Sequence, residues 1–128
     1  MPRVSAAFFA WGVISLLIGM LAGMEMGAHQ DMTLMPAHAH LNLLGWVTMG
    51  LYGVFYALTA GSYSPKLAWA NFIASAAGVA VMIPALGLYL MNGMDQKFIP
   101  GIVVGEVLTV LGVILFGISV ARELFRRA

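Results

Sequence analysis

Four long apolar runs alternate with short polar segments along the chain. The runs cover about residues 6–26, 37–60, 67–91 and 99–121. An α-helix rises 1.5 Å per residue, so about 20 apolar residues cross a hydrocarbon core of roughly 30 Å. The pattern therefore predicts four transmembrane helices, and the first is long enough to be a span and not a signal peptide.

The segments between the apolar runs are short, at residues 27–36, 61–66 and 92–98. Helices joined by such short connections must be antiparallel neighbours. We expect one domain over residues 1–128, an all-α membrane protein built as a four-transmembrane-helix antiparallel bundle. Four helices enclose little volume, so a cofactor site is more easily built between protomers, and we expect a homo-oligomer in the lipid bilayer.

Composition excludes several classes of protein. Of the 128 residues, 62% are hydrophobic and only 9% are charged, which is too much apolar surface for a soluble domain of this size. The absence of cysteine excludes disulfides, thiolate metal sites and thiol nucleophiles. A formal net charge of +1 gives no basis for binding nucleic acid.

The positive charges are distributed unevenly about the apolar runs. Only Lys97 falls on the side opposite the two termini, and the other five lie on the terminal side: Arg3, Lys66, Arg122, Arg126 and Arg127. The positive-inside rule then places both termini in the cytoplasm. We expect a multi-pass protein of a bacterial inner (plasma) membrane.

Small residues recur at four-residue spacing on the first two spans. The two ridges are Gly19, Gly23 and Gly27, and Gly53, Ala57 and Gly61. Such small-xxx-small ridges let helix backbones approach closely. On the third span, Pro84 is expected to kink the helix.

The three histidines, His29, His38 and His40, lie within twelve residues at the outward end of the first two spans. Two residues on a helix are separated by about 200°, so His38 and His40 cannot both bind one metal ion from a regular helix. Each imidazole could serve as a metal ligand at a different interface, or both could form interfacial hydrogen bonds. His29, in a polar loop, is expected to face water. Asn42 and Trp46 complete the candidate site.

Glu106 lies inside the fourth span, about 10 Å below the outer boundary at 1.5 Å per residue. A carboxyl group at that depth must be protonated, paired or hydrated. Glu106 could accept a hydrogen bond from an imidazole N–H and so fix the tautomer of that ring, as carboxylates do around metal-bound histidines. It could instead act as a proton relay. It could also be a neutral carboxyl bonded to the backbone.

Methionines are dense before the two histidines, at Met20, Met24, Met26, Met32 and Met35. Thioethers and imidazoles are suitable ligands for Cu(I). The alternative site is therefore copper held by Met24, Met26 and His29 with the other histidines. Methionine is also common filling in apolar helices, which needs no metal.

Residues 36–46, Pro-Ala-His-Ala-His-Leu-Asn-Leu-Leu-Gly-Trp, resemble the second transmembrane helix of the haem-copper oxidase subunit I superfamily. The resemblance implies that His38 is an axial ligand of haem b and that the chain is one four-helix arc of a three-arc architecture. The family's tenth helix, the second helix of its own arc, carries a His-x-His whose two imidazoles serve different haems, and His38-Ala39-His40 is similar to it. By analogy, a homotrimer, or a dimer, would hold haem between His38 of one protomer and His40 of the next.

The chain also departs from that family. It has no adjacent His-His pair and no His-x-x-x-Tyr, so the family's copper centre has no counterpart and proton-pumping oxidase activity is not expected. The predicted function is noncovalent haem b binding for electron transfer, with a quinol or cytochrome partner, or for interaction with oxygen or nitric oxide. The alternatives are copper binding or delivery, and a cofactor-free structural subunit or small transporter using Glu106.

Overall fold

A computed structural model describes residues 1–126 of the chain, so Arg127 lies outside the described residues. All of its regular structure is helical. The elements are α1 (Arg3–His29), α2 (Met35–His40), η1 (Leu41–Thr48), α3 (Met49–Leu58), α4 (Pro65–Met91), η2 (Gln96–Phe98) and α5 (Ile99–Leu124). Elements α2, η1 and α3 form one continuous span, so the described chain has four helices long and apolar enough to cross a membrane. The prediction of an all-α protein with four such helices is confirmed.

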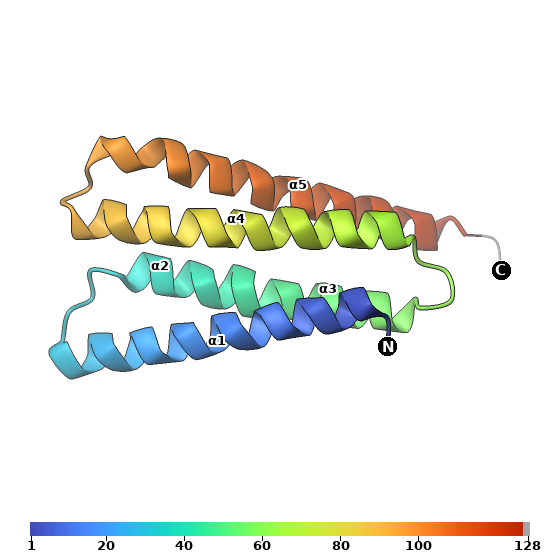
Figure 1. Cartoon of the computed structure of the whole chain (residues 1–128), viewed down its shortest axis with the longest axis horizontal. Coiled ribbons are helices and arrows are strands. Elements are labelled where there is room, and N and C mark those ends of the chain that lie inside the picture. The colour runs from blue at the N-terminus through green and yellow to red at the C-terminus, as the bar shows by residue number, and fades with distance from the viewer. Residues whose placement is uncertain (127–128) are drawn as a thin grey trace.

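Consecutive spans run in opposite directions, so α1 begins and α5 ends at the same end of the bundle, the terminal end (Figure 1). Helix α1 packs against the α2–η1–α3 span, and α4 packs against α5. Helix α4 also contacts α1 and the α2–η1 segment, which joins the two hairpins. Pro84 does not end α4, which continues through it to Met91.

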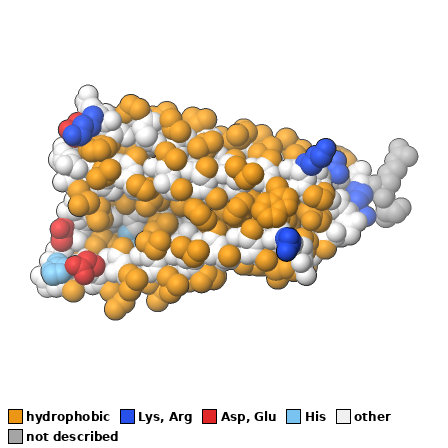
Figure 2. Space-filling view, viewed as in Figure 1, with side chains coloured by type: hydrophobic (Ala, Val, Ile, Leu, Met, Phe, Trp, Pro, Cys, Tyr) orange, Lys and Arg blue, Asp and Glu red, His pale blue; other side chains and the backbone are white. Residues whose placement is uncertain are grey.

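On the face shown in Figure 2, the surface between the two ends of the bundle is mostly apolar, and charged side chains lie near the ends. Helix α1 begins at Arg3 and α4 begins beside Lys66 at the end that carries both termini, where Arg126 also pairs with Glu123 at 3.0 Å. Lys97 lies at the opposite end, beside Asp95. This arrangement suits helices in a bilayer, whose hydrocarbon core excludes charge.

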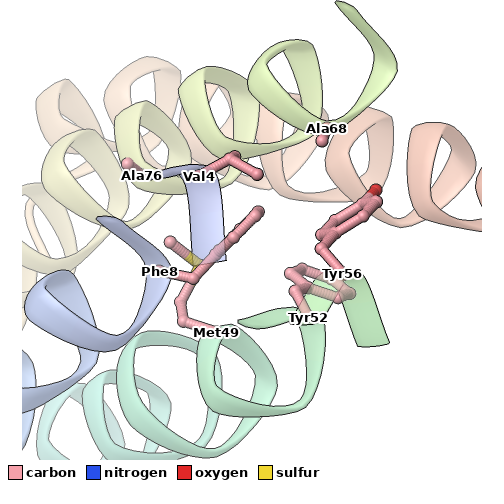
Figure 3. Close-up of a cluster of buried hydrophobic side chains, with 7 residues drawn as sticks. All are labelled: Val4, Phe8, Met49, Tyr52, Tyr56, Ala68 and Ala76. Carbon is pink, nitrogen blue, oxygen red and sulfur yellow. The ribbon is translucent and has the colours of Figure 1, made fainter. Parts of the chain in front are cut away.

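The terminal end of the bundle is closed by a core of aromatic side chains (Figure 3). Phe8 of α1 lies 5.5 Å from Tyr52 and 5.7 Å from Tyr56, measured between ring centroids. Phe116 of α5 reaches across to Tyr52 at 4.6 Å. Aromatic pairs at these separations contribute beyond their buried area, so this end holds α1, α3 and α5 together.

A buried polar network accompanies the aromatic core. The hydroxyl of Tyr56 lies 2.9 Å from that of Ser119, and the Asn71 side-chain amide donates to the Tyr56 oxygen at 3.3 Å. Ser75 donates to Asn71 Oδ1 at 2.8 Å. These bonds link α3, α4 and α5, because polar groups in an apolar interior require partners.

Glycines of α1 make room for large side chains of the second span. A Cβ at Gly19 would collide with the Asn42 amide, and one at Gly23 would come within 3.1 Å of the His38 ring. At Gly12 the neighbour is Trp46, at 3.0 Å. The predicted close contact is thus confirmed at Gly19 and Gly23. It is wrong at Gly27, where nothing lies within 4 Å of an added Cβ.

The second small-residue ridge is only partly used. A Cβ at Gly53 would lie 3.2 Å from the ring of Phe9, whereas Gly61 has no neighbour within 4 Å. Of the two glycines in this ridge, only Gly53 makes the predicted close contact.

The second span contains a π-helical segment that the apolar pattern does not reveal. Residues Leu41–Thr48 form η1, in which the Thr48 hydroxyl donates to the carbonyl of Leu43 at 2.8 Å. Segments of π-helix are rare and occur often at functional sites. This one begins directly after His40, so it determines which side of the span each residue of Leu41–Thr48 faces.

Candidate functional site

His38 and His40 line two different pockets on either side of the second span. His38 borders a pocket of about 420 Å³ between α1, α2 and α4, whose other walls are apolar. His40 borders a pocket of about 520 Å³ between the second span, α4 and α5. The predicted separation of the two imidazoles follows from their two-residue spacing on helix α2.

The local sequence explains why the histidines lie at the far end of the bundle from the termini. Pro36 occupies the first turn of α2, where its missing N–H costs no hydrogen bond and its fixed φ favours a helix. The His38 backbone N–H donates to the Leu34 carbonyl at 2.9 Å, which closes that turn. Both imidazoles are therefore held within the first two turns of the span.

His40 is exposed, and one of its ring nitrogens is already engaged. Nδ1 donates to the carbonyl oxygen of Pro36 over 2.7 Å. A carbonyl only accepts, so the neutral ring carries its hydrogen on Nδ1 and leaves a lone pair on Nε2. This is the tautomer that many metal-bound histidines adopt, because a backbone carbonyl often takes the other N–H. The His40 ring is thus prepared to act as a ligand through Nε2.

His38 is partly buried against α1. Its Nε2 lies 3.3 Å from the Asn42 side-chain nitrogen, and its ring covers Gly23. Its Nδ1 and the Asn42 Oδ1 are buried and have no hydrogen-bond partner among the described residues. Buried polar atoms without partners are costly, so the contact between His38 and Asn42 leaves one hydrogen-bonding atom of each side chain unsatisfied.

Asn42 and Trp46 follow His38 down the same side of the span. All three face α1, over Gly23, Gly19 and Gly12 in turn. Asn42 therefore positions the His38 ring, and Trp46 packs between helices. Neither of them lines the pocket that contains His40.

Glu106 and His40 line the same pocket, together with Thr109 and Met82. The Glu106 side chain is exposed on α5, and Thr109 donates its hydroxyl to the Gly105 carbonyl at 2.9 Å. The expectation that Glu106 lies near the histidine level agrees with this shared pocket. The Nδ1 hydrogen of His40 goes to Pro36, so Glu106 is not its acceptor.

The alternative copper residues do not converge. Met24 is 69% exposed and Met26 is 7% exposed, because the two lie on different faces of α1. Met26 shares a pocket of about 160 Å³ with His29, but neither Met24 nor the other two histidines line it. His29 Nε2 pairs with Glu25 at 2.8 Å. Within residues 1–126, no group of three or more His, Asp or Glu side chains could hold a metal ion.

A turn beside this pocket carries a titratable group. Asp31 accepts hydrogen bonds from the Thr33 hydroxyl and, at 3.0 Å, from the Thr33 backbone N–H. These bonds favour the carboxylate and lower the pKa of Asp31, and the side-chain bond has the larger effect. The interaction fixes the loop that leads into α2.

Sequence reasoning misses two parts of this region. The acceptor of His40 is the backbone of Pro36, a group that no side-chain motif reveals, and the Pro four residues before the histidine is its only signal. The π-helix beneath the histidines leaves no mark in the apolar pattern. No family model, curated protein or solved structure matches the chain significantly.

Proposed function

We propose that this chain is a haem-binding membrane protein in which His40 supplies an axial ligand to haem b. The observation that carries the proposal is the His40 imidazole, whose Nδ1 is bonded to the Pro36 carbonyl and which lines a pocket of about 520 Å³. An apolar pocket with a few placed polar groups is typical of a cofactor site. The likeness of residues 36–46 to the haem-copper oxidase superfamily supports the same cofactor.

His38 is the second ligand in this proposal, supplied by a neighbouring protomer. The two histidines of one chain lie on opposite sides of the span, so one iron cannot receive both from the same chain. In the single chain, His38 Nδ1 is buried and Nε2 lies 3.3 Å from the Asn42 side-chain nitrogen, so this role requires the His38 ring to turn toward the pocket that it borders. A homotrimer would then hold haem between His40 of one protomer and the turned His38 ring of the next.

The number of imidazole ligands decides the chemistry. Haem iron with two imidazoles transfers single electrons, whereas one imidazole leaves a position for oxygen or nitric oxide. With two histidines available, we propose electron transfer, with a quinol or a cytochrome as the redox partner. In that role Glu106 provides a polar group close to the His40 ligand.

The proposed location is a bacterial inner membrane, with both termini in the cytoplasm. The positive charges near the termini support this orientation through the positive-inside rule. The haem would then lie near the outer face, where α2 begins.

The direct test is the absorption spectrum of protein purified in detergent after expression with haem, oxidised and dithionite-reduced. The chain as it stands should show a Soret band and sharp reduced α and β bands. His40→Ala should lose them, and His38→Ala should lose or shift them. His29→Ala is the matched control and should leave the spectrum unchanged, since His29 pairs with Glu25.

A colourless preparation after expression with ample haem would contradict the proposal. Copper found in that preparation, and lost in Met26→Leu, would favour the copper alternative. The mass of the haem-loaded particle, measured by light scattering, tests the trimer. A monomer with full haem content would exclude a site shared between protomers.

A further inference from the structure

Three cationic side chains at the terminal end of the bundle have no carboxylate partner. Arg3, Lys66 and Arg122 are exposed, and none of them forms an ion pair among residues 1–126. Arg126, at the same end, pairs with Glu123. The proposed haem function does not use the three unpaired side chains, which we call the terminal cations.

The terminal cations lie at one depth in the membrane. Arg3 begins α1, Lys66 lies in the first turn of α4, and Arg122 lies in the last turn of α5. The apolar spans end at these turns, so the three charges lie at the level of the lipid head groups. A partner that neutralises them must present negative charge in the same plane.

The terminal cations are arranged around the start of α4. Arg3 precedes Val4, and Val4 is buried in the same core as Ala68, which lies in the first turn of α4 (Figure 3). Arg122 lines a small cavity together with Ser64, whose side chain caps the first turn of α4. Both arginines are therefore held beside the turn that carries the lysine.

The carboxylate at the terminal end is already engaged. Glu123 accepts a hydrogen bond from the Ser62 hydroxyl at 2.7 Å and pairs with Arg126 at 3.0 Å. The carboxylates of the loops and of the last turns of α1 lie at the opposite end, at Glu25, Asp31 and Asp95. Figure 2 shows acidic side chains at that end and Lys and Arg side chains near the terminal end. The terminal end therefore keeps an excess of positive charge.

Trp69 indicates that the partner is a lipid and not a soluble anion. This residue follows Lys66 by one helical turn, is 38% exposed and packs edge-on against Phe72, with 5.7 Å between ring centroids. Tryptophan is favoured at the boundary between hydrocarbon and head groups, because its ring is apolar and its N–H is a donor. A molecule that covers both side chains needs an apolar part beside the indole and an anionic part beside the ammonium group.

We infer that the terminal cations bind the head group of an anionic phospholipid, a phosphodiester such as that of phosphatidylglycerol. Guanidinium and ammonium groups donate charge-assisted hydrogen bonds to phosphate oxygens. A zwitterionic head group carries its own ammonium, which cancels the phosphate charge, so the excess positive charge selects the anionic lipid. The inference depends neither on haem nor on the oligomeric state.

The test is native mass spectrometry of the full-length protein in a neutral detergent, titrated separately with dioleoyl phosphatidylglycerol and dioleoyl phosphatidylethanolamine. We expect phosphatidylglycerol to bind more tightly. Lys66→Gln and Arg122→Gln should each weaken its binding about fivefold, the value of one basic side chain near an anionic lipid surface. Arg122→Lys keeps the charge and should retain binding. Lys97→Gln, the matched control, removes the same charge at the opposite end and should bind like the original protein.

Three results would overturn the inference. The first is equal affinity of the original protein for the two lipids. The second is equal weakening in Lys97→Gln and Lys66→Gln, because net charge alone would then explain the binding. The third is displacement of phosphatidylglycerol by an equal concentration of glycerol 1-phosphate, because the site would then take a soluble phosphate. A colourless protein that still selects phosphatidylglycerol would remove the haem proposal and leave this one standing.

Discussion

The Nδ1 atom of His40 lies 2.7 Å from the carbonyl oxygen of Pro36, one helical turn earlier in the same chain. A carbonyl cannot donate, so this contact selects one tautomer of the neutral ring. It also orients the ring, with Nε2 directed away from the helix backbone. One backbone carbonyl in the first turn of α2 thus defines the tautomer of the histidine that follows.

The tautomer of His40 can be measured directly. In haem-free protein with ¹⁵N-labelled histidine, the neutral His40 ring should show a protonated Nδ1 and an unprotonated Nε2. His40→Ala assigns the signals, because they should disappear in that variant alone. A protonated Nε2 in the neutral ring would show that the Pro36 contact does not form.

Gly19 should not tolerate a side chain. A Cβ there would collide with Asn42, so Gly19→Val should lower the free energy of unfolding by about 1–3 kcal/mol. Gly27→Ala is the matched control on the same helix. It meets nothing within 4 Å and should be neutral or stabilising by up to about 1 kcal/mol. Thermal unfolding followed by circular dichroism in detergent measures both, and equal effects would contradict the packing.

The polar network around Asn71 should contribute to stability. Asn71→Leu keeps the size of the side chain but leaves Ser75 without its acceptor. We expect a loss of about 1–2 kcal/mol in the free energy of unfolding. Asn92→Ala removes an exposed amide that bonds the Leu88 carbonyl, and should cost much less. An Asn71→Leu protein as stable as the original would show that the network is dispensable.

The Asp31 turn should make stability depend on pH. Hydrogen bonds from Thr33 lower the pKa of Asp31 in the folded chain below its ordinary value of about 3.9. The stabilisation is therefore complete above that ordinary value and is lost as the pH falls through the lowered pKa. Asp31→Asn should unfold at a lower temperature than the original protein at pH 7, and the difference should vanish at strongly acidic pH. A difference that persists there would contradict this account.

The orientation of the bundle can be tested with introduced thiols, because the chain has no cysteine. Met32→Cys, in the loop before α2, should react with an impermeant maleimide in intact spheroplasts. Gly61→Cys, between α3 and α4, should react only after the membrane is permeabilised. The two sites lie at opposite ends of the bundle, so each is the other's control. The reversed pattern would place the termini outside.

The sequence predicts the helical fold well because membrane helices follow from local properties. Run length and apolar content determine where spans form, and the expected span of residues 67–91 differs from α4 by two residues at its start. The opposite facing of His38 and His40 also follows from helix geometry alone. The position of His40 at the start of a span could be deduced for the same reason.

The contacts between spans required the tertiary structure. Gly19 and Gly27 belong to the same sequence ridge, yet only Gly19 meets a neighbour, because the rotation and tilt of α1 against the second span decide which glycines are covered. Glu106 and His40 are far apart in the chain and share a pocket through the packing of α5 beside α4. Trp11 of α1 and Ala80 of α4 likewise line one cavity only after the two hairpins associate.

The sequence by itself determined that this protein is a set of four apolar helices with two histidines on opposite faces near one end. These features depend on composition, spacing and helical period, which are local along the chain. The tertiary structure alone decided which side chains share a pocket, which ring nitrogen stays free and where polar groups lack partners. Those features depend on the rotation of each helix about its axis, which packing against the other helices sets.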